Sequence, residues 1–94
     1  LPPEQISEVM RAGLPRLRQC YERSLRTNPR LESRPLLAIR IAPDGHVAKA
    51  SLSGENLPEA LERCVVQEAQ ALRFPKPEGG SVSFEVPLNL KAGP

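Results

Sequence analysis

The chain has few aromatic residues, no tryptophan, a single histidine and no long hydrophobic segment. One tyrosine and two phenylalanines in 94 residues leave little material for stacking nucleic-acid bases. No apolar run approaches the ~20 residues of a membrane-spanning helix, and no secretory signal peptide is recognisable. The sequence begins abruptly at Leu1, so we interpret residues 1–94 as a single excised domain, with a core of about 6–90 and a targeting segment elsewhere.

Candidate catalytic and metal-binding residues are equally scarce. His46 directly follows an Asp-Gly turn signal and is expected to be a solvated turn residue. A structural zinc site needs four ligands at suitable spacing, whereas Cys20, Cys64 and His46 supply three scattered ones. The glycines at 79–80 precede a predicted strand rather than a helix, which does not fit a phosphate-binding loop. We therefore expect a protein that is not an enzyme and that binds no metal or cofactor.

A long amphipathic helix is predicted at the start of the chain and ends at Asn28-Pro29. Its apolar residues fall on one arc of the helical wheel: Ile6, Val9, Met10, Leu14, Leu17, Cys20, Tyr21 and Leu25. Pro15 lies on the opposite arc and removes a backbone hydrogen bond, so we expect a kinked helix or two segments in line.

The rest of the chain alternates between strand and helix patterns. Residues 36–42 and 47–53 predict a hairpin around Pro43-Asp44-Gly45, with a bulge because Val47 is out of phase with the alternation that follows. A second helix is predicted over residues 58–72, with Glu68 as a misfit on its apolar arc, expected at the rim of the core. Residues 81–90 alternate regularly and predict a half-buried strand. The expected fold class is α+β, in the order α-β-β-α-β: a three-stranded antiparallel sheet with both helices on one face.

The two cysteines admit two interpretations. Cys20 and Cys64 each lie on the apolar side of a predicted helix, and helices packed on the same sheet face would bring them together. A disulfide between them would indicate an oxidising compartment. Two free cysteines buried in the core are the alternative.

The last predicted strand carries Pro87, which has no N–H and is typical of an edge strand. If its nitrogen points away from the sheet, the backbone groups of Ser83, Glu85 and Asn89 face an open edge. Such an edge is a template for a partner strand, or an edge that Pro87 and Glu85 protect against aggregation. The candidate partner-binding residues are Ser81, Val82, Ser83, Phe84, Glu85 and Val86.

Arginines are concentrated in the first forty residues, where eight of them face four glutamates. A phosphate-binding surface is one interpretation of this excess. The glutamates interleave with the arginines, aromatic residues for stacking are missing, and the net charge of the chain is only +2. We expect a solvated helix face and no nucleic-acid partner.

Several short motifs together resemble a known family. They are Cys20-Tyr21-Glu22, Asn28-Pro29, the segment 41–47 (IAPDGHV), Cys64-Val65-Val66, Arg73-Phe74-Pro75 and Gly79-Gly80. In this order they resemble the AgmX/PglI type of C-terminal domain, a relative of the TonB C-terminal domain in envelope and gliding-motility proteins. The family pattern has cysteines at the positions of Cys20 and Cys64, which favours the disulfide. Leu72, where an aromatic residue is usual, and Glu32-Ser33-Arg34, where a glycine is usual, depart from that pattern.

The resemblance implies a periplasmic domain of a protein anchored in the inner membrane. Its implied partners are periplasmic or outer-membrane envelope proteins, held by strand addition to the last strand, so that the domain serves a trans-envelope machine such as gliding motility. Three alternatives stand beside this one. They are a TonB-type energy transducer for outer-membrane receptors, a structural or self-associating module, and the arginine-face nucleic-acid binder.

Overall fold

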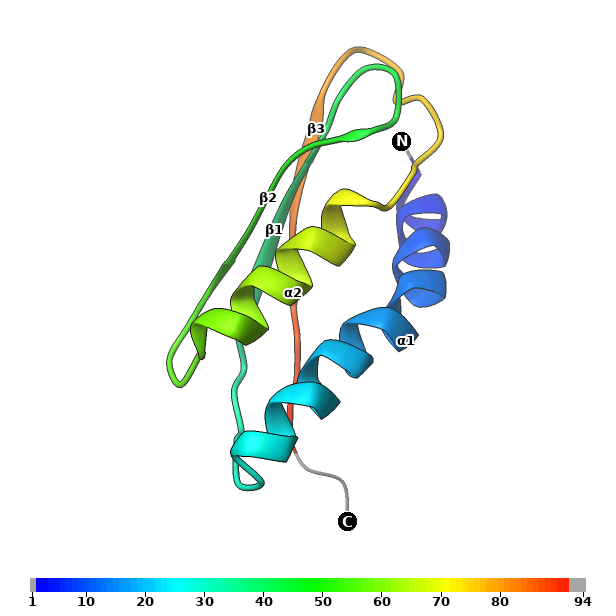
Figure 1. Ribbon diagram of the computed structural model, residues 1–94. Helices are drawn as coiled ribbons and strands as arrows, with labels where there is room; N and C mark the ends of the chain where they lie inside the picture. The colour runs from blue at the N-terminus through cyan, green and yellow to red at the C-terminus, as the bar shows by residue number, and fades with distance from the viewer. Residues whose placement is uncertain (1, 92–94) are drawn as a thin grey trace.

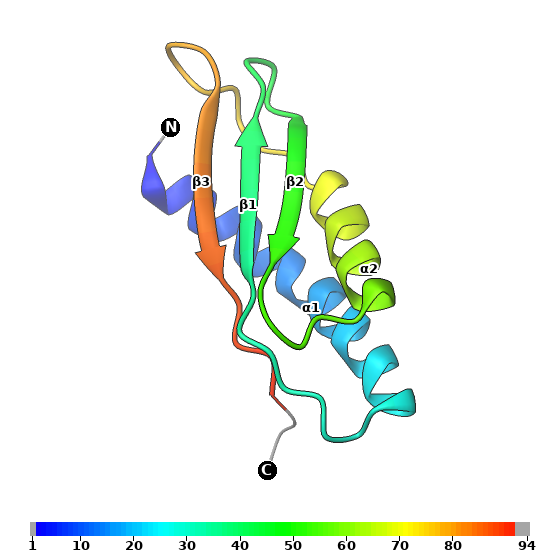
Figure 2. The same ribbon diagram turned by 90° about the vertical axis from the view of Figure 1, so that its left-hand side faces the viewer.

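A computed structural model describes residues 2–91 as two helices packed on one face of a small sheet (Figures 1 and 2). The elements are α1 (Pro3–Thr27), β1 (Leu36–Ile41), β2 (Val47–Ser53), α2 (Glu59–Gln70) and β3 (Val82–Pro87). The strands are antiparallel in the order β2-β1-β3. The predicted fold class, element order and one-sided helix layer are confirmed.

Helix α1 is continuous through Pro15, so of the two expected forms the structure has the kinked helix and not two segments in line. Its ribbon changes direction near the middle in Figure 1, as expected where a proline removes a hydrogen bond. Pro3 occupies the first turn, where a missing N–H costs nothing, and the helix ends before Asn28. Leu14, assigned to the apolar arc, is 39% exposed, because that arc is wider than the surface that the sheet and α2 cover.

The hairpin contains the predicted bulge. Arg40 pairs with Lys49, but the next pair is Ile41 with Val47, so Ala48 is the extra residue in β2. In the turn, the carboxylate of Asp44 accepts the His46 backbone N–H at 3.1 Å, an Asx-type turn. The irregular alternation around Val47 therefore has a structural cause.

The core lies between β1, α2 and the middle of α1. Leu37, Ile41, Leu61 and Val65 are completely buried. Glu68 is half-buried at the rim of this core, as expected. Both helices lie on the same side of the sheet (Figure 2), so the other face is open to solvent and its residues Lys49, Ser51, Ser83 and Glu85 are exposed.

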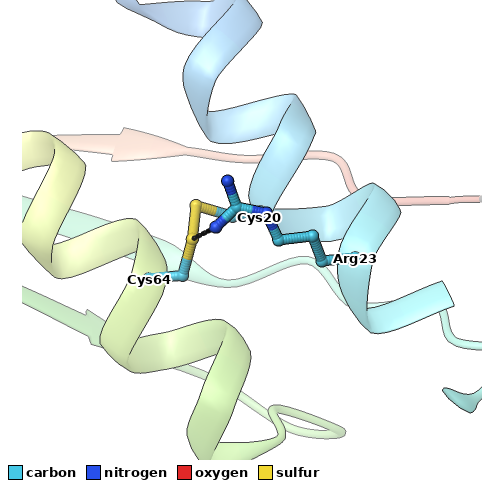
Figure 3. Close-up of a disulfide and its surroundings, with 3 residues drawn as sticks. All are labelled: Cys20, Arg23 and Cys64. Atoms are coloured by element: carbon cyan, nitrogen blue, oxygen red, sulfur yellow. Dashed lines mark hydrogen bonds between the residues drawn. A yellow bond between two sulfur atoms is a disulfide. The ribbon is translucent and has the colours of Figure 1, made fainter. Parts of the chain in front are cut away.

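Cys20 and Cys64 form a disulfide between α1 and α2, with their Cα atoms 5.7 Å apart (Figure 3). The interpretation as two free thiols is thereby wrong. Cys20 is buried and Cys64 half-buried, and Nη1 of Arg23 lies 3.9 Å from the Cys64 sulfur. One arginine therefore stands beside the exposed half of the bridge.

The segment after α2 is anchored to the hairpin turn rather than being a plain extended connector. The Phe74 N–H donates to the Gly45 carbonyl at 2.9 Å, next to an isolated bridge between His46 and Arg73. The Phe74 ring is buried and meets Phe84 of β3 edge to face, with centroids 5.9 Å apart. This contact holds the start of the segment after α2 against β3.

Candidate docking edge

The hydrogen bonds at the end of β3 determine which of its backbone groups face β1. The Leu88 N–H donates to the Pro35 carbonyl at 2.9 Å. Ser33 and Leu90 exchange two bonds of 2.8 and 2.9 Å, which makes them a hydrogen-bonded antiparallel pair. Since such pairs recur every second residue, even-numbered residues of the last strand bond inward along its whole length.

Odd-numbered residues of the last strand consequently direct their N–H and C=O groups away from β1. The register agrees, because Val86, Phe84 and Val82 lie opposite Leu37, Ile39 and Ile41. The nitrogen of Pro87 points to the open side, where its missing N–H interrupts no bond with β1. Within residues 2–91 no strand pairs with this side of β3. The predicted edge position and its backbone phase are confirmed.

The six predicted partner-binding residues divide into three groups. Ser83 and Glu85 present both backbone groups at the open edge with exposed side chains. Val82, Phe84 and Val86 bond to β1 and turn half-buried side chains toward the helix layer, so they support the edge without offering backbone groups to it. Ser81 precedes β3, which begins one residue later and ends at Pro87, three residues before the predicted end.

Asn89 belongs to the edge but was not among the predicted binding residues. It lies in the segment that pairs with residues 33–35 beyond the end of β3, and its backbone has the same phase as Ser83 and Glu85. The alternation of the sequence over residues 81–90 already indicated this position. Pro87 offers only a carbonyl here, so the open edge has a gap in its row of donors between Glu85 and Asn89.

The solvent face of the sheet is charged near the open edge. Arg40 of β1 lies between Lys49 of β2 and Ser83 of β3 in the register. Glu85 stands one position along from Ser83 on the same face and is exposed. A partner strand would therefore meet Ser83 and Glu85 first on this face, with two cations behind them.

The opposite edge of the sheet differs in its surroundings. Helix α2 packs against β2 and runs along the outer side of that strand in Figure 2. The first residues after the hairpin turn are also joined to the segment that follows α2, through the bridge of His46 with Arg73. The edge of β3 is therefore the more accessible of the two.

His46 and Tyr21 each take part in a local hydrogen bond. His46 is exposed beside Asp44, and hydrogen bonds from the His46 backbone and side chain lower the pKa of that carboxyl. Tyr21 donates its hydroxyl to the Leu31 carbonyl, and burial, followed by the charge of Glu32, raises the pKa of Tyr21. Across residues 2–91, no three His, Cys, Asp or Glu side chains are grouped to hold a metal ion.

Comparison with protein-family models, with curated proteins and with solved structures gave no match. Neither helix of the described part of the chain combines the length and apolar character needed to cross a membrane. The fold and the open edge therefore define an α+β domain with one accessible strand.

Proposed function

We propose that this domain is a non-enzymatic protein–protein interaction module of the periplasm that binds envelope partners by adding their strand to β3. Its parent chain, on this proposal, is anchored in the inner membrane and serves a trans-envelope machine of the gliding-motility kind. The resemblance to AgmX/PglI-type domains supports the setting, and the geometry of β3 supports the mode of binding.

One observation carries the binding mode. The backbone groups of Ser83, Glu85 and Asn89 face outward in one row, on a strand that is held from the other side by β1. Main-chain hydrogen bonds to such a row provide affinity, while side chains at alternate positions provide selectivity. The exposed Ser83 and Glu85 side chains stand where that selectivity would act.

The disulfide supports an oxidising compartment. Bridges of this kind are rare in reducing cytosol and persist in the periplasm. A small domain of 94 residues also gains more from a staple than a large one does, because it buries a smaller share of its surface. A periplasmic location would let this disulfide form and persist.

Site-specific photocrosslinking in cells tests the proposal directly. A benzophenone amino acid at Ser83 or Glu85 of the full-length parent protein should yield adducts with an envelope protein. The same group at Arg63, exposed on α2 away from the edge, is the control and should not yield that adduct. Equal crosslinking from both places, or adducts with cytosolic proteins, would contradict the proposal.

Proline substitution then tests the role of the backbone. Glu85→Pro removes one outward N–H. We expect the affinity for the crosslinked partner to fall about tenfold, because the interface loses one well-formed hydrogen bond and the proline ring adds some strain. Glu85→Ala keeps the N–H and should change affinity less.

Hydrogen exchange provides a check that does not depend on the variants. The amides of Ser83, Glu85 and Asn89 should exchange fast in the free domain and slowly in the complex, whereas Phe84 and Val86 stay protected in both.

The alternatives give different results in the same experiments. An energy transducer would crosslink from Ser83 to the short coupling segments of outer-membrane receptors, and synthetic peptides of those segments would compete. A self-associating module would crosslink to a second copy, and sedimentation would show a dimer. A nucleic-acid binder would show steep salt dependence of DNA or RNA binding that the edge variants leave unchanged.

A further inference from the structure

Two depressions adjoin the last strand, and each measures about 480 Å³, so size does not distinguish them. One is on the solvent face of the sheet and is lined mainly by polar side chains of all three strands. The other lies between α1 and the segment that continues β3. Its apolar lining is formed by Leu14, Leu17, Leu25, Leu88 and Leu90. We call this second depression the α1 groove.

The α1 groove opens on the side of the molecule where the last strand is unpaired. Cys20 marks the side of α1 that faces α2, since it is bonded to Cys64, and Gly13 on the same side of α1 lies against Leu72 just after the end of α2. At about 100° per residue, Leu14 projects about 100° from Gly13 and about 120° from Cys20, and Arg18 projects farther from both. The α1 groove therefore lies on the far side of α1 from α2.

The open backbone row runs into this groove. Asn89 lines the groove and carries outward backbone groups, while Leu88 and Leu90, its neighbours, turn their side chains to the helix layer and form the groove wall. A strand added along Ser83 and Glu85 and continued past Pro87 would place its helix-side residues over Leu14 and Leu88. This arrangement gives the exposure of Leu14 a reason.

The charges of the groove indicate which partner fits it. Arg18 on α1 and Lys91 on the strand continuation stand on opposite walls, against the single carboxylate of Glu22. Neither cation has an ion-pair partner within 4.0 Å among residues 2–91. An acidic side chain entering between them would be complementary, and complementary charge raises both specificity and the association rate.

We propose that the α1 groove is the selectivity site for the docked strand, and that its occupant is an extended, acidic–apolar segment of a partner protein. The segment has branched apolar residues at alternate positions facing Leu14 and an Asp or Glu that reaches Arg18 and Lys91. This inference rests on the proposed strand addition and extends it beyond the six edge residues. A second copy of the chain fits less well, because its own last strand turns only apolar side chains, Val82, Phe84 and Val86, to the helix side and would bring no carboxylate to Arg18.

Selection from an unbiased library of phage-displayed dodecapeptides tests the groove on the disulfide-bonded domain. We expect enrichment of peptides with alternate Val, Ile or Leu and at least one Asp or Glu. The dissociation constant of the best enriched peptide, made synthetically, should rise about tenfold with Arg18→Glu and about tenfold with Leu14→Asp. Both side chains are exposed, so these variants should keep the wild-type melting temperature within a few degrees.

Arg16→Glu is the matched control. Arg16 lies two residues from Arg18 on the same helix but on its α2 side, and its reversal changes the net charge equally. Affinity should change less than twofold. Enrichment of basic peptides, no enrichment at all, or equal losses from Arg16→Glu and Arg18→Glu would overturn the groove proposal.

The outcomes separate this proposal from the one it rests on. Binding that Glu85→Pro weakens but Leu14→Asp and Arg18→Glu leave unchanged overturns the groove and keeps strand addition. Binding insensitive to all three overturns both. A concentration-dependent dimer that Leu14→Asp dissociates would show that a second copy fills the groove, and the partner-segment proposal would then be wrong.

Discussion

The Gly45 carbonyl accepts the Phe74 N–H at 2.9 Å, so the hairpin turn and the segment after α2 hold each other through backbone groups. Gly45 has φ +95, and a Cβ there would stand 2.2 Å from the Phe74 carbonyl oxygen. The turn thus needs glycine for two reasons, backbone conformation and closeness to another segment.

Gly45→Ala should lower the free energy of unfolding by about 3–4 kcal/mol, since left-handed strain and a backbone clash combine. Gly79→Ala is the control, because Gly79 has φ +81 with nothing within 4 Å of its added Cβ. It should cost only about 1–2 kcal/mol. Urea unfolding at neutral pH measures both, and equal losses would contradict the clash.

Removing the bridge between Cys20 and Cys64 should destabilise the domain. A closed loop with a sequence separation of 44 corresponds to about 4 kcal/mol in the chain-entropy model. We expect the Cys20→Ala, Cys64→Ala double variant to unfold at a much lower urea concentration. If the unfolding midpoint of the variant lies within about 0.3 M urea of that of the oxidised wild type, the two differ in free energy of unfolding by only about 0.5 kcal/mol. Such a small difference would show that the loop contributes little entropy.

Reduction should begin at Cys64. Its side chain is half-buried while Cys20 is buried, and Arg23 stands beside its sulfur (Figure 3). Glutathione, an anionic thiol, should form its mixed disulfide on Cys64. Arg23→Gln should slow that step roughly twofold to fivefold, because it removes one surface charge interaction with glutathione. Mass spectrometry locates the adduct. With the neutral thiol mercaptoethanol, the variant should react at nearly the wild-type rate. Adducts mainly on Cys20 would contradict the prediction.

Acid should remove a contribution from Asp44. Hydrogen bonds with His46 lower the pKa of Asp44 in the folded chain, so its ionised form stabilises folding. That contribution is complete above the unfolded value of 3.8 and is lost as pH falls through the lower folded value. Asp44→Asn should therefore be less stable than wild type at pH 6 and differ less from it near pH 2. A difference that stays constant across this range would contradict the assignment.

Truncation of a leucine should cost much more stability on α2 than on α1. Leu61 is completely buried, and Leu61→Ala should cost about 2–5 kcal/mol through loss of burial and a residual cavity. Leu14 is 39% exposed, and Leu14→Ala should change the free energy of unfolding by less than about 0.5 kcal/mol. Thermal unfolding of both variants checks the contrast. A large loss from Leu14→Ala would place that residue in the core and remove the reason for a groove.

Much of the fold could be predicted from the periodicity of apolar residues and from single residues whose backbone chemistry allows few positions, such as Pro87. The phase of Val47 predicted the bulge, and Pro87 predicted the edge position of the last strand together with the direction of its backbone groups. The anchoring of Phe74 to Gly45 was missed, because pairing between a turn and a distant segment leaves no periodic pattern. The α1 groove was also missed. A helical wheel separates apolar from polar residues, but it does not show which apolar residues a neighbouring element covers, and Leu14 is one that remains uncovered.

The disulfide also divides the covalent chain into a direct path and a closed loop that lies outside this path. The shortest covalent path through the domain runs along α1 to Cys20, crosses to Cys64, and continues through α2 into β3. Residues 21–63, which include the whole hairpin, form a loop that the disulfide closes and that lies outside this path. Once the hydrogen bonds between β1 and β3 have broken, stretching would put no tension on β1 and β2, and the attainable extension would be shorter by roughly 150 Å at about 3.4 Å per residue.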